Sequence, residues 1–180
     1  IFIGPPGCGK GTQANILKES TLPDLNILTV SSLLKEKSQD ESILGKDIKN
    51  KMDNGDLIED TIVISVLKEK VNTLSNEQIL IDGFPRSSIQ ADSLLEIFEN
   101  KDLSIINFEV DDEQLLQRIK KRSMEESRAD DSFFEKRLQI YKKSHLEILN
   151  SLKKNYPVTD IQANDEIRSV TAKIVDKLGL

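Results

Sequence analysis

Glycines and a lysine that could hold a phosphate group lie near the start of the chain, in Gly4-Pro-Pro-Gly-Cys-Gly-Lys-Gly-Thr12. Glycines at this spacing let backbone N–H groups turn toward phosphate oxygens, and Lys10 adds a mobile positive charge. A helical pattern from Lys10 to Lys18 follows, and its N-terminus favours anions. Gly11 separates the lysine from Thr12, whereas the common motif has serine or threonine directly after the lysine. The segment indicates a phosphate-binding loop; a glycine-rich turn without a ligand is the alternative.

Arginine is rare in the chain and is concentrated in one part of it. Six of the 25 basic residues are arginine, and four of these lie between residues 118 and 137. Fixed guanidinium groups stabilise the charge that develops in phosphoryl transfer without a general base. The lone His145 therefore need not be catalytic and fits a solvated or core-edge position. Arg118 and Arg122 share one helical face, so surface charges are the alternative for this pair, and Arg168 matches no motif.

A carboxylate ends the expected strand 78–82. Its position places Asp82 at the carboxyl edge of a parallel sheet, beside the glycine-rich loop, where it could hold Mg²⁺ through water. The Thr12 hydroxyl could approach the same ion. A turn or helix-cap role is the alternative for Asp82. Cys8, at a variable position of the loop, fits a small side chain under the turn.

Composition limits the classes of protein to which the chain can belong. Its 180 residues suit one domain, and a net charge of −6 disfavours nucleic acid or an anionic membrane as a partner. Apolar runs are too short for a membrane span or a signal peptide, which favours the cytoplasm. One cysteine and one histidine exclude an internal disulfide and the usual zinc site. Because the chain starts inside an expected strand without methionine, we expect further residues upstream.

Apolar runs of strand length alternate with segments of helical period, which predicts an α/β fold with a mainly parallel sheet. Five strands are expected, at residues 1–4, 26–29, 78–82, 103–110 and 157–162. Helical spacing of apolar residues covers 62–74, 134–152 and 167–178. Two segments are interpreted as insertions: the helical, polar residues 30–60, with Gly45 and Gly55 as breaks, and the short charged loop 122–131. Each glycine is either a hinge or an ordinary loop residue.

The glycine-rich segment Gly4–Thr12, extended to Gln13, resembles the phosphate loop of adenylate kinases and related nucleoside monophosphate kinases. Asp82-Gly-Phe-Pro-Arg86 resembles their second signature, and further matches run through Gly55-Asp-Leu-Ile58, Arg118-x3-Arg122, Arg128-Ala-Asp-Asp131 and Arg137-Leu-x-x-Tyr141. The resemblance implies a P-loop NTPase-type fold, in which helices flank a parallel five-stranded sheet. It also implies one domain, 1–180, with a core of 1–29, 61–121 and 132–180, a monophosphate-binding insert at 30–60 and a short lid at 122–131.

The implied activity is reversible, Mg²⁺-dependent transfer of the terminal phosphoryl group of ATP to a nucleoside monophosphate, most simply AMP, by a monomer. Catalytic roles are implied for Lys10, Arg86, Arg122, Arg128 and Arg137. ATP binding is implied for Gly7, Cys8, Gly9, Lys10, Gly11, Thr12, Arg118, Arg122 and Asp165. AMP binding is implied for Val30, Lys35, Asp56, Leu57, Ile58, Gly83, Phe84, Pro85, Arg86, Gln90, Arg128 and Arg137. Mg²⁺, held through water, is implied for Thr12 and Asp82.

The chain departs from the family after the second strand. Where adenylate kinases usually carry Ser-Thr-Gly-Asp-x-Leu-Arg, it reads Thr29-Val-Ser-Ser-Leu-Leu-Lys35. Val30 lacks the hydroxyl that faces the acceptor base, and Lys35 lacks the guanidinium fork that clamps the acceptor phosphate. Two alternatives follow: a CMP, UMP or broad-specificity kinase, and a nucleotide-binding module of a longer protein with weakened acceptor binding. Gln90 favours AMP, and the five arginines of the family motifs favour an enzyme.

Overall fold

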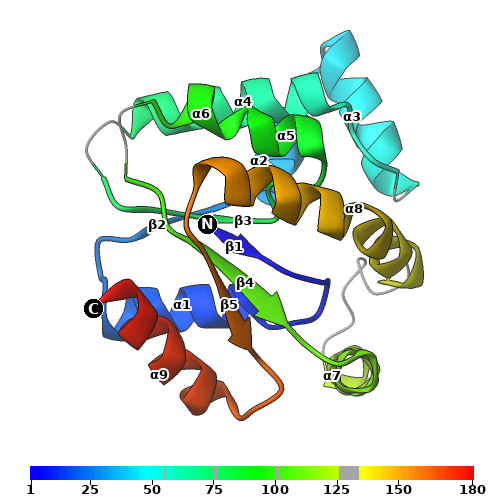
Figure 1. The fold of residues 1–180 in the computed structure, drawn as a ribbon. Helices are drawn as coiled ribbons and strands as arrows, with labels where there is room; N and C mark the ends of the chain where they lie inside the picture. Colours follow the sequence, from blue (N-terminus) through cyan, green and yellow to red (C-terminus); the bar gives the residue numbers. More distant parts are fainter. Residues whose placement is uncertain (55, 75–76, 100–101, 126–133) are drawn as a thin grey trace.

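A central parallel sheet organises the computed structural model, which describes residues 1–54, 56–74, 77–99, 102–125 and 134–180. The strands are β1 (Phe2–Ile3), β2 (Asn26–Thr29), β3 (Ile79–Asp82), β4 (Ile105–Glu109) and β5 (Val158–Gln162), in the spatial order β2-β3-β1-β4-β5. Every pairing is parallel. The predicted five-stranded parallel sheet flanked by helices is therefore confirmed (Figure 1).

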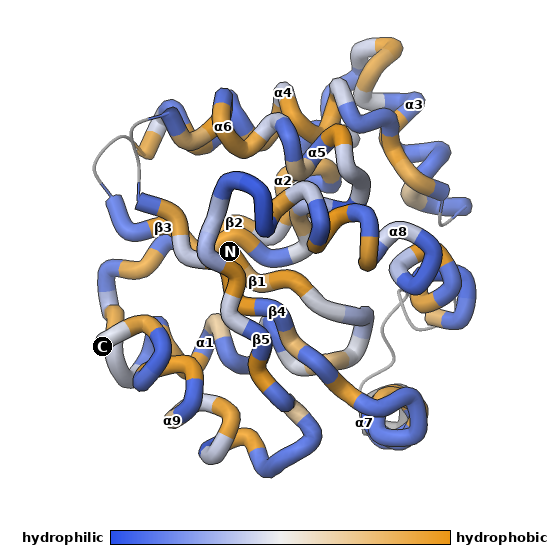
Figure 2. The backbone as a smooth tube through the Cα atoms, in the orientation of Figure 1, coloured by the Kyte–Doolittle hydropathy of each residue, from blue (hydrophilic) through white to orange (hydrophobic). Residues whose placement is uncertain are grey.

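The helices are α1 (Lys10–Ser20), α2 (Val30–Lys37), α3 (Ile43–Asp53), α4 (Asp60–Thr73), α5 (Ser88–Asp92), α6 (Leu94–Ile97), α7 (Asp112–Glu125), α8 (Phe134–Asn155) and α9 (Ile167–Leu178). Helices α1 and α9 cover one face of the sheet, and α2, α4, α5, α6 and α8 cover the other (Figure 1). Hydrophobic and hydrophilic residues alternate along these helices, as one-sided burial requires (Figure 2). Within the described residues, no helix combines the length and apolar composition needed to cross a membrane.

Both faces of the sheet are apolar because successive strand residues point to opposite sides. Ile105 belongs to a buried cluster with α2, α3, α4, α5, α6 and the later part of α8, whereas the next residue, Ile106, belongs to a second cluster with α1, α7, α9 and the start of α8. The same alternation separates Ile81 from Leu80. Strands β3 and β4 are thus buried on two sides, which explains why they read as short continuous apolar runs.

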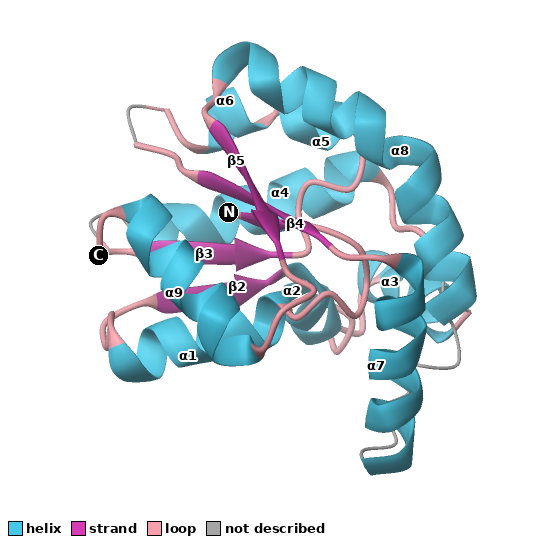
Figure 3. Ribbon diagram, turned by 60° about the horizontal axis from the view of Figure 1, so that its bottom comes forward, coloured by secondary structure: helices cyan, strands magenta, loops and turns pink. Residues whose placement is uncertain are grey.

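Parallel pairing brings the carboxyl ends of the strands to one edge of the sheet. The arrows of β2, β3, β4 and β5 in Figure 3 point toward this edge. The loops that follow β1, β3, β4 and β5 leave from it and lead to the glycine-rich loop, to the segment 83–87 and to the starts of α7 and α9. In doubly wound folds this edge is where ligands bind.

Two expectations about the insertions need correction. Gly45 lies inside α3 and is buried, so it is neither a break nor a loop residue. A Cβ built there would meet the carbonyl oxygen of Asp40 at 2.1 Å, and this close approach explains the glycine. Residues 122–125 continue helix α7, so the expected charged loop 122–131 begins as helix. The other expected break, Gly55, and the remainder of that loop lie outside the described residues.

Candidate active site

The glycine-rich loop connects β1 to α1. Gly9 has φ = 101° at the N-terminal cap of α1, a left-handed conformation that favours glycine. The Lys10 ammonium donates to the carbonyl oxygens of Gly4 at 2.9 Å and Pro5 at 3.0 Å, so it lies across the loop. The ammonium also lies 3.4 Å from Sγ of Cys8. Cys8 itself is buried, which agrees with the expected small side chain under the turn. A positive charge and the helix N-terminus therefore meet at one place, which suits a phosphate group.

Asp82 ends β3 beside this loop. In the sheet register it is level with Phe2 of β1 and Thr29 of β2, at the carboxyl edge. A Cβ built on Gly11 would lie 3.7 Å from Asp82 Oδ2, so the carboxylate lies close to the first turn of α1. Thr12, in the same turn, is exposed. Hydroxyl and carboxylate oxygens are ligands that Mg²⁺ prefers, so the residues present fit this ion.

Arg118, on α7, ties the loop to the end of β5. Its guanidinium donates to the carbonyl oxygens of Cys8 at 3.2 Å and Ala163 at 2.6 Å. The neighbouring loops are joined by a reciprocal pair: Asp111 N–H donates to Asn164 Oδ1 at 3.0 Å, and Asn164 Nδ2 donates to Asp111 Oδ2 at 2.9 Å. This network favours a site role for Arg118 over an ordinary surface charge. The predicted donor-site residue Asp165 is exposed, and its carboxylate accepts from Lys173 at 2.6 Å.

The second signature segment turns sharply after β3. Phe84 and Pro85 are buried and joined by a cis peptide bond, and Gly83 has φ = 85°. Arg86 Nε donates to the Gly83 carbonyl oxygen at 2.9 Å, which holds the guanidinium near the carboxyl edge of β3. The backbone N–H of Arg86 donates to Gln90 Oε1 at 2.8 Å. Gln90 is only 4% exposed, and its Nε2 donates to Asp60 Oδ1 at 2.7 Å.

The remaining acceptor-site predictions fall on α2 and on the segment before α4. Val30, the first residue of α2, is buried, whereas Lys35, Asp56 and Leu57 are exposed. Ile58 is buried in the core cluster that includes α4.

A link to α8 joins this acceptor segment. Lys136 Nζ lies 2.6 Å from Asp56 Oδ1 and 3.4 Å from the carbonyl oxygen of Asn54. This ion pair connects two parts of the chain that are 80 residues apart, and both of its side chains are exposed.

The structure describes the arginines that follow Arg118 to different extents. Arg137 is partly buried on α8 and has interaction partners. Arg122 lies in the part of α7 for which only the backbone is described, and Arg128 lies outside the described residues. Arg168 is exposed at the start of α9, as expected for a solvated residue.

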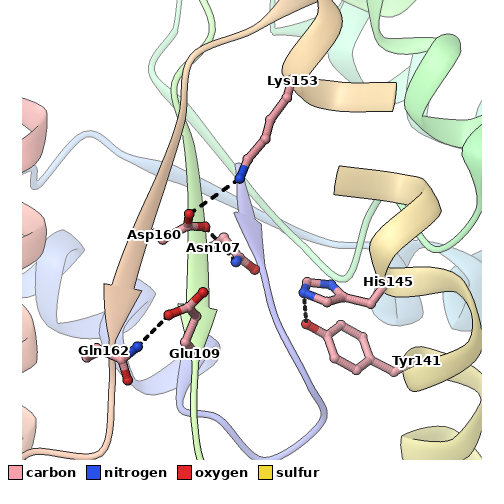
Figure 4. Close-up of polar contacts among 7 residues, drawn as sticks. All are labelled: Asn107, Glu109, Tyr141, His145, Lys153, Asp160 and Gln162. Carbon is pink, nitrogen blue, oxygen red and sulfur yellow. Dashed lines mark hydrogen bonds and ion pairs between the residues drawn. The ribbon is translucent and has the colours of Figure 1, made fainter. Parts of the chain in front are cut away.

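A group of polar side chains lies between α8 and the strands β4 and β5 (Figure 4). Asn107 is fully buried and its Nδ2 donates to Asp160 Oδ1 at 2.8 Å; among the described residues its Oδ1 has no partner. His145 Nε2 lies 3.2 Å from the Tyr141 hydroxyl, and the centroids of the two rings lie 4.5 Å apart with the ring planes tilted by 31°. Burial lowers the pKa of His145, although nearby Asp160 opposes this shift. The histidine therefore lies at the edge of the core, as expected.

Sequence reasoning did not identify three residues around the site: Asp60, Lys136 and Asp111, the partner of Asn164. Each acts through a contact with a residue far away in the chain, from 30 to 80 positions distant. Asp60 carried one local signal, because an acid before a run of helical period is typical of a helix start. The signal indicates the helix and gives no hint of the contact with Gln90.

Comparison with known proteins identifies relatives of this arrangement. The sequence model of the family "Adenylate kinase" matches residues 2–157. An adenylate kinase of Prochlorococcus marinus (strain MIT 9211) is 33% identical over 185 residues, covering 100% of this chain and 96% of that protein. One of Leptospira biflexa is 31% identical, covering 99% and 98%. One of Borrelia duttonii is 40% identical over 125 residues, covering 68% of this chain and 56% of that protein.

The family model covers both signature segments, and the matches to the Prochlorococcus and Leptospira proteins also extend over the whole sheet that brings these segments together. The resemblance first noticed in the phosphate loop and in Asp82–Arg86 is thereby confirmed, and the chain belongs to the adenylate kinase family.

Proposed function

We propose that this chain transfers the terminal phosphoryl group of Mg-ATP reversibly to AMP, giving two molecules of ADP. The observation that carries the proposal is the meeting of cationic groups from distant segments at one edge of the sheet. Lys10 lies across the loop after β1, Arg118 joins that loop to the end of β5, and Arg86 follows β3. The family is one of phosphotransferases, which sets the class of reaction.

The chemistry needs charge stabilisation more than proton transfer. An oxygen of the AMP phosphate attacks the γ-phosphorus of ATP, and the bond from that phosphorus to the β–γ bridging oxygen breaks, releasing ADP. Lys10 and the N-terminus of α1 would bind the donor phosphates, and Arg86 would bind the acceptor phosphate. Arg122, Arg128 and Arg137 would approach the transferred group, whose equatorial oxygens carry the developing charge.

Mg²⁺ fits the donor side of this site. Asp82, at the end of β3, and Thr12, at the start of α1, would hold the ion, in part through water. When bound, the ion supplies neutralisation of charge on the β- and γ-phosphates.

Closure over the substrates is part of the proposal. We assign the monophosphate-binding insert to residues 30–60 and the lid to 122–131, within one domain whose core is 1–29, 61–121 and 132–180. Closing these segments would exclude water that otherwise hydrolyses ATP. The contact between Lys136 and Asp56 supports this arrangement, because it joins α8 directly to the insert.

A broader acceptor range is the second candidate. Val30 is buried and apolar, so its side chain cannot hydrogen-bond an acceptor base. Lys35 is exposed and carries a point charge in place of a bidentate fork. Both features favour looser selection among monophosphates.

The test is a transfer assay with Mg-ATP against AMP, CMP, UMP, GMP and no acceptor, with diphosphate formation measured for each and Mg²⁺ omitted in a parallel series. AMP-dependent and Mg²⁺-dependent ADP formation is the expected result. Comparable rates with the pyrimidine nucleotides would favour the second candidate. Binding of ATP without transfer to any acceptor would contradict the proposal and indicate a nucleotide-binding module.

A further inference from the structure

Asp60 contacts the one glutamine side chain that we assign to the acceptor base. Gln90 is nearly fully buried, and its amide is held from two sides: Oε1 accepts from the Arg86 backbone N–H at 2.8 Å, and Nε2 donates to Asp60 Oδ1 at 2.7 Å. The partners come from different elements, because Arg86 follows β3 and Asp60 begins α4. The amide therefore links the second signature segment to α4.

Both partners require the same orientation of the amide. An ionised carboxylate only accepts hydrogen bonds, and a backbone N–H only donates them. Turning the Gln90 amide by 180° would place Oε1 against the Asp60 carboxylate and Nε2 against the Arg86 N–H. Two repulsive contacts would replace two hydrogen bonds, so the turned orientation is strongly disfavoured.

A fixed amide offers its remaining groups in a fixed order. One N–H of Nε2 and one lone pair of Oε1 are left after the two contacts are made. Adenine offers an acceptor at N1 and a donor at its 6-amino group, whereas hypoxanthine offers a donor at N1 and an acceptor at O6. A freely rotating amide could match either edge by turning over, but a fixed one matches only one of them.

We infer that Asp60 is a positioning residue that makes the acceptor site select 6-amino over 6-oxo purine monophosphates, by holding the Gln90 amide in one orientation. This inference rests on the proposed function, since it requires that Gln90 faces the acceptor base. It gives base selection a source other than residue 30, where the chain has valine. Asp60 acts through Gln90 and need not touch the substrate.

The experiment compares AMP with IMP, which differ only at position 6 and in the N1 proton. The kcat/KM ratio of AMP to IMP is measured with saturating Mg-ATP for the wild type, Asp60→Asn and Asp60→Ala. The amide introduced by Asp60→Asn can pair with either orientation of the Gln90 amide, so the ratio is expected to fall by about tenfold, the effect of losing one charge-assisted hydrogen bond. Glu59→Gln is the matched control, because Glu59 is the neighbouring acid at the same helix start and contacts Lys51 instead.

The outcomes separate base selection from a merely structural role. A lower AMP to IMP ratio in both Asp60 variants, with the wild-type ratio kept in Glu59→Gln, supports the inference. An unchanged ratio in a folded Asp60 variant overturns it, and so does an equal fall in Glu59→Gln, which would indicate a general effect at the start of α4. Failure of the wild type to phosphorylate either nucleotide would overturn the proposed function itself, a result distinct from transfer to AMP with an Asp60-independent ratio.

Discussion

Lys10 and Arg86 are the two cations that we assign to different substrates. Lys10→Met removes the ammonium from the phosphate loop, so transfer is expected to fall by about 10²–10³-fold and ATP binding to weaken. Arg86→Lys keeps a charge but loses the fork, so the KM for AMP is expected to rise about tenfold with little change for ATP. Steady-state kinetics with each substrate varied, together with ATP titration calorimetry, measure both effects.

The control for both substitutions is Arg168→Lys, because Arg168 is exposed and lies outside the family motifs. It should leave both KM values unchanged. Equal loss of ATP affinity in Lys10→Met and Arg86→Lys would contradict the division of roles, since it would place both cations on the donor nucleotide.

His145 is expected to make folding stability depend on pH. Burial lowers the pKa of His145 below its ordinary value of 6.5, which the unfolded chain retains. The unfolded state then binds the proton more readily, so stability is complete above pH 6.5 and decreases as the pH falls below it. His145→Gln keeps a polar side chain beside Tyr141 but cannot titrate. Urea unfolding at pH 7.5 and 5.5 should show a smaller loss of stability in the variant than in the wild type.

Since this is the single histidine of the chain, its proton NMR titration gives the folded pKa without assignment. Parallel loss of stability in the wild type and the variant would contradict the prediction, and so would a folded pKa at or above 6.5. The carboxylate of Asp160 would then outweigh burial.

At the scale of elements, α3 depends on one glycine. A methyl group at position 45 would meet the Asp40 carbonyl oxygen at 2.1 Å, and backbone cannot move aside as a flexible side chain can. Gly45→Ala is therefore expected to destabilise the protein by about 1–3 kcal/mol, even though alanine favours helix. Lys46→Ala, at the adjacent exposed position, should be nearly neutral. Urea unfolding of both variants measures the difference, and a Gly45→Ala variant as stable as the wild type would show that the 38–42 loop adjusts freely.

The elements themselves could largely be predicted from the sequence. The strands 26–29 and 78–82 were expected almost to the residue, because apolar runs bounded by turn residues are typical of strands buried on two faces. Helices α5 and α6 were not expected, since five and four residues are too few for a helical period to show. The role of Gly45 could not be predicted either, because a glycine in a polar segment indicates a break unless the packing around it is known.

Within the site, too, local features could be predicted from the sequence and long-range contacts could not. The phosphate loop could be predicted because its glycines and lysine are adjacent in sequence, and the helix that follows fixes their geometry locally. The hydrogen bond from Gln90 to Asp60, by contrast, joins residues that are 30 positions apart and lie on different helices. Only the packing of α4 against α5 brings these residues together, and no spacing in the sequence encodes that packing.

At the scale of the whole molecule, the sheet separates two hydrophobic cores and contributes residues to both. Leu17 on α1 is fully buried in one cluster, and Leu67 on α4 is fully buried in the other. Consecutive residues of β3 and β4 contribute to opposite clusters, so the loss of either core would expose apolar side chains of the same two strands. The fold should therefore unfold as a unit.

Leu17→Ala and Leu67→Ala test this unity, and each is expected to destabilise the protein by about 2–5 kcal/mol. The chain has two tyrosines and no tryptophan, and Tyr156 packs against the cluster that contains Leu67. In a Tyr141→Phe background Tyr156 is the single tyrosine, so its fluorescence reports on one face, whereas circular dichroism reports on all helices. If the two cores unfold together, Leu17→Ala shifts both signals to the same lower urea midpoint, although its cavity lies on the face away from Tyr156. A fluorescence midpoint that stays at the wild-type value while the helical signal moves would show that the two faces unfold separately, and that the sheet does not couple them.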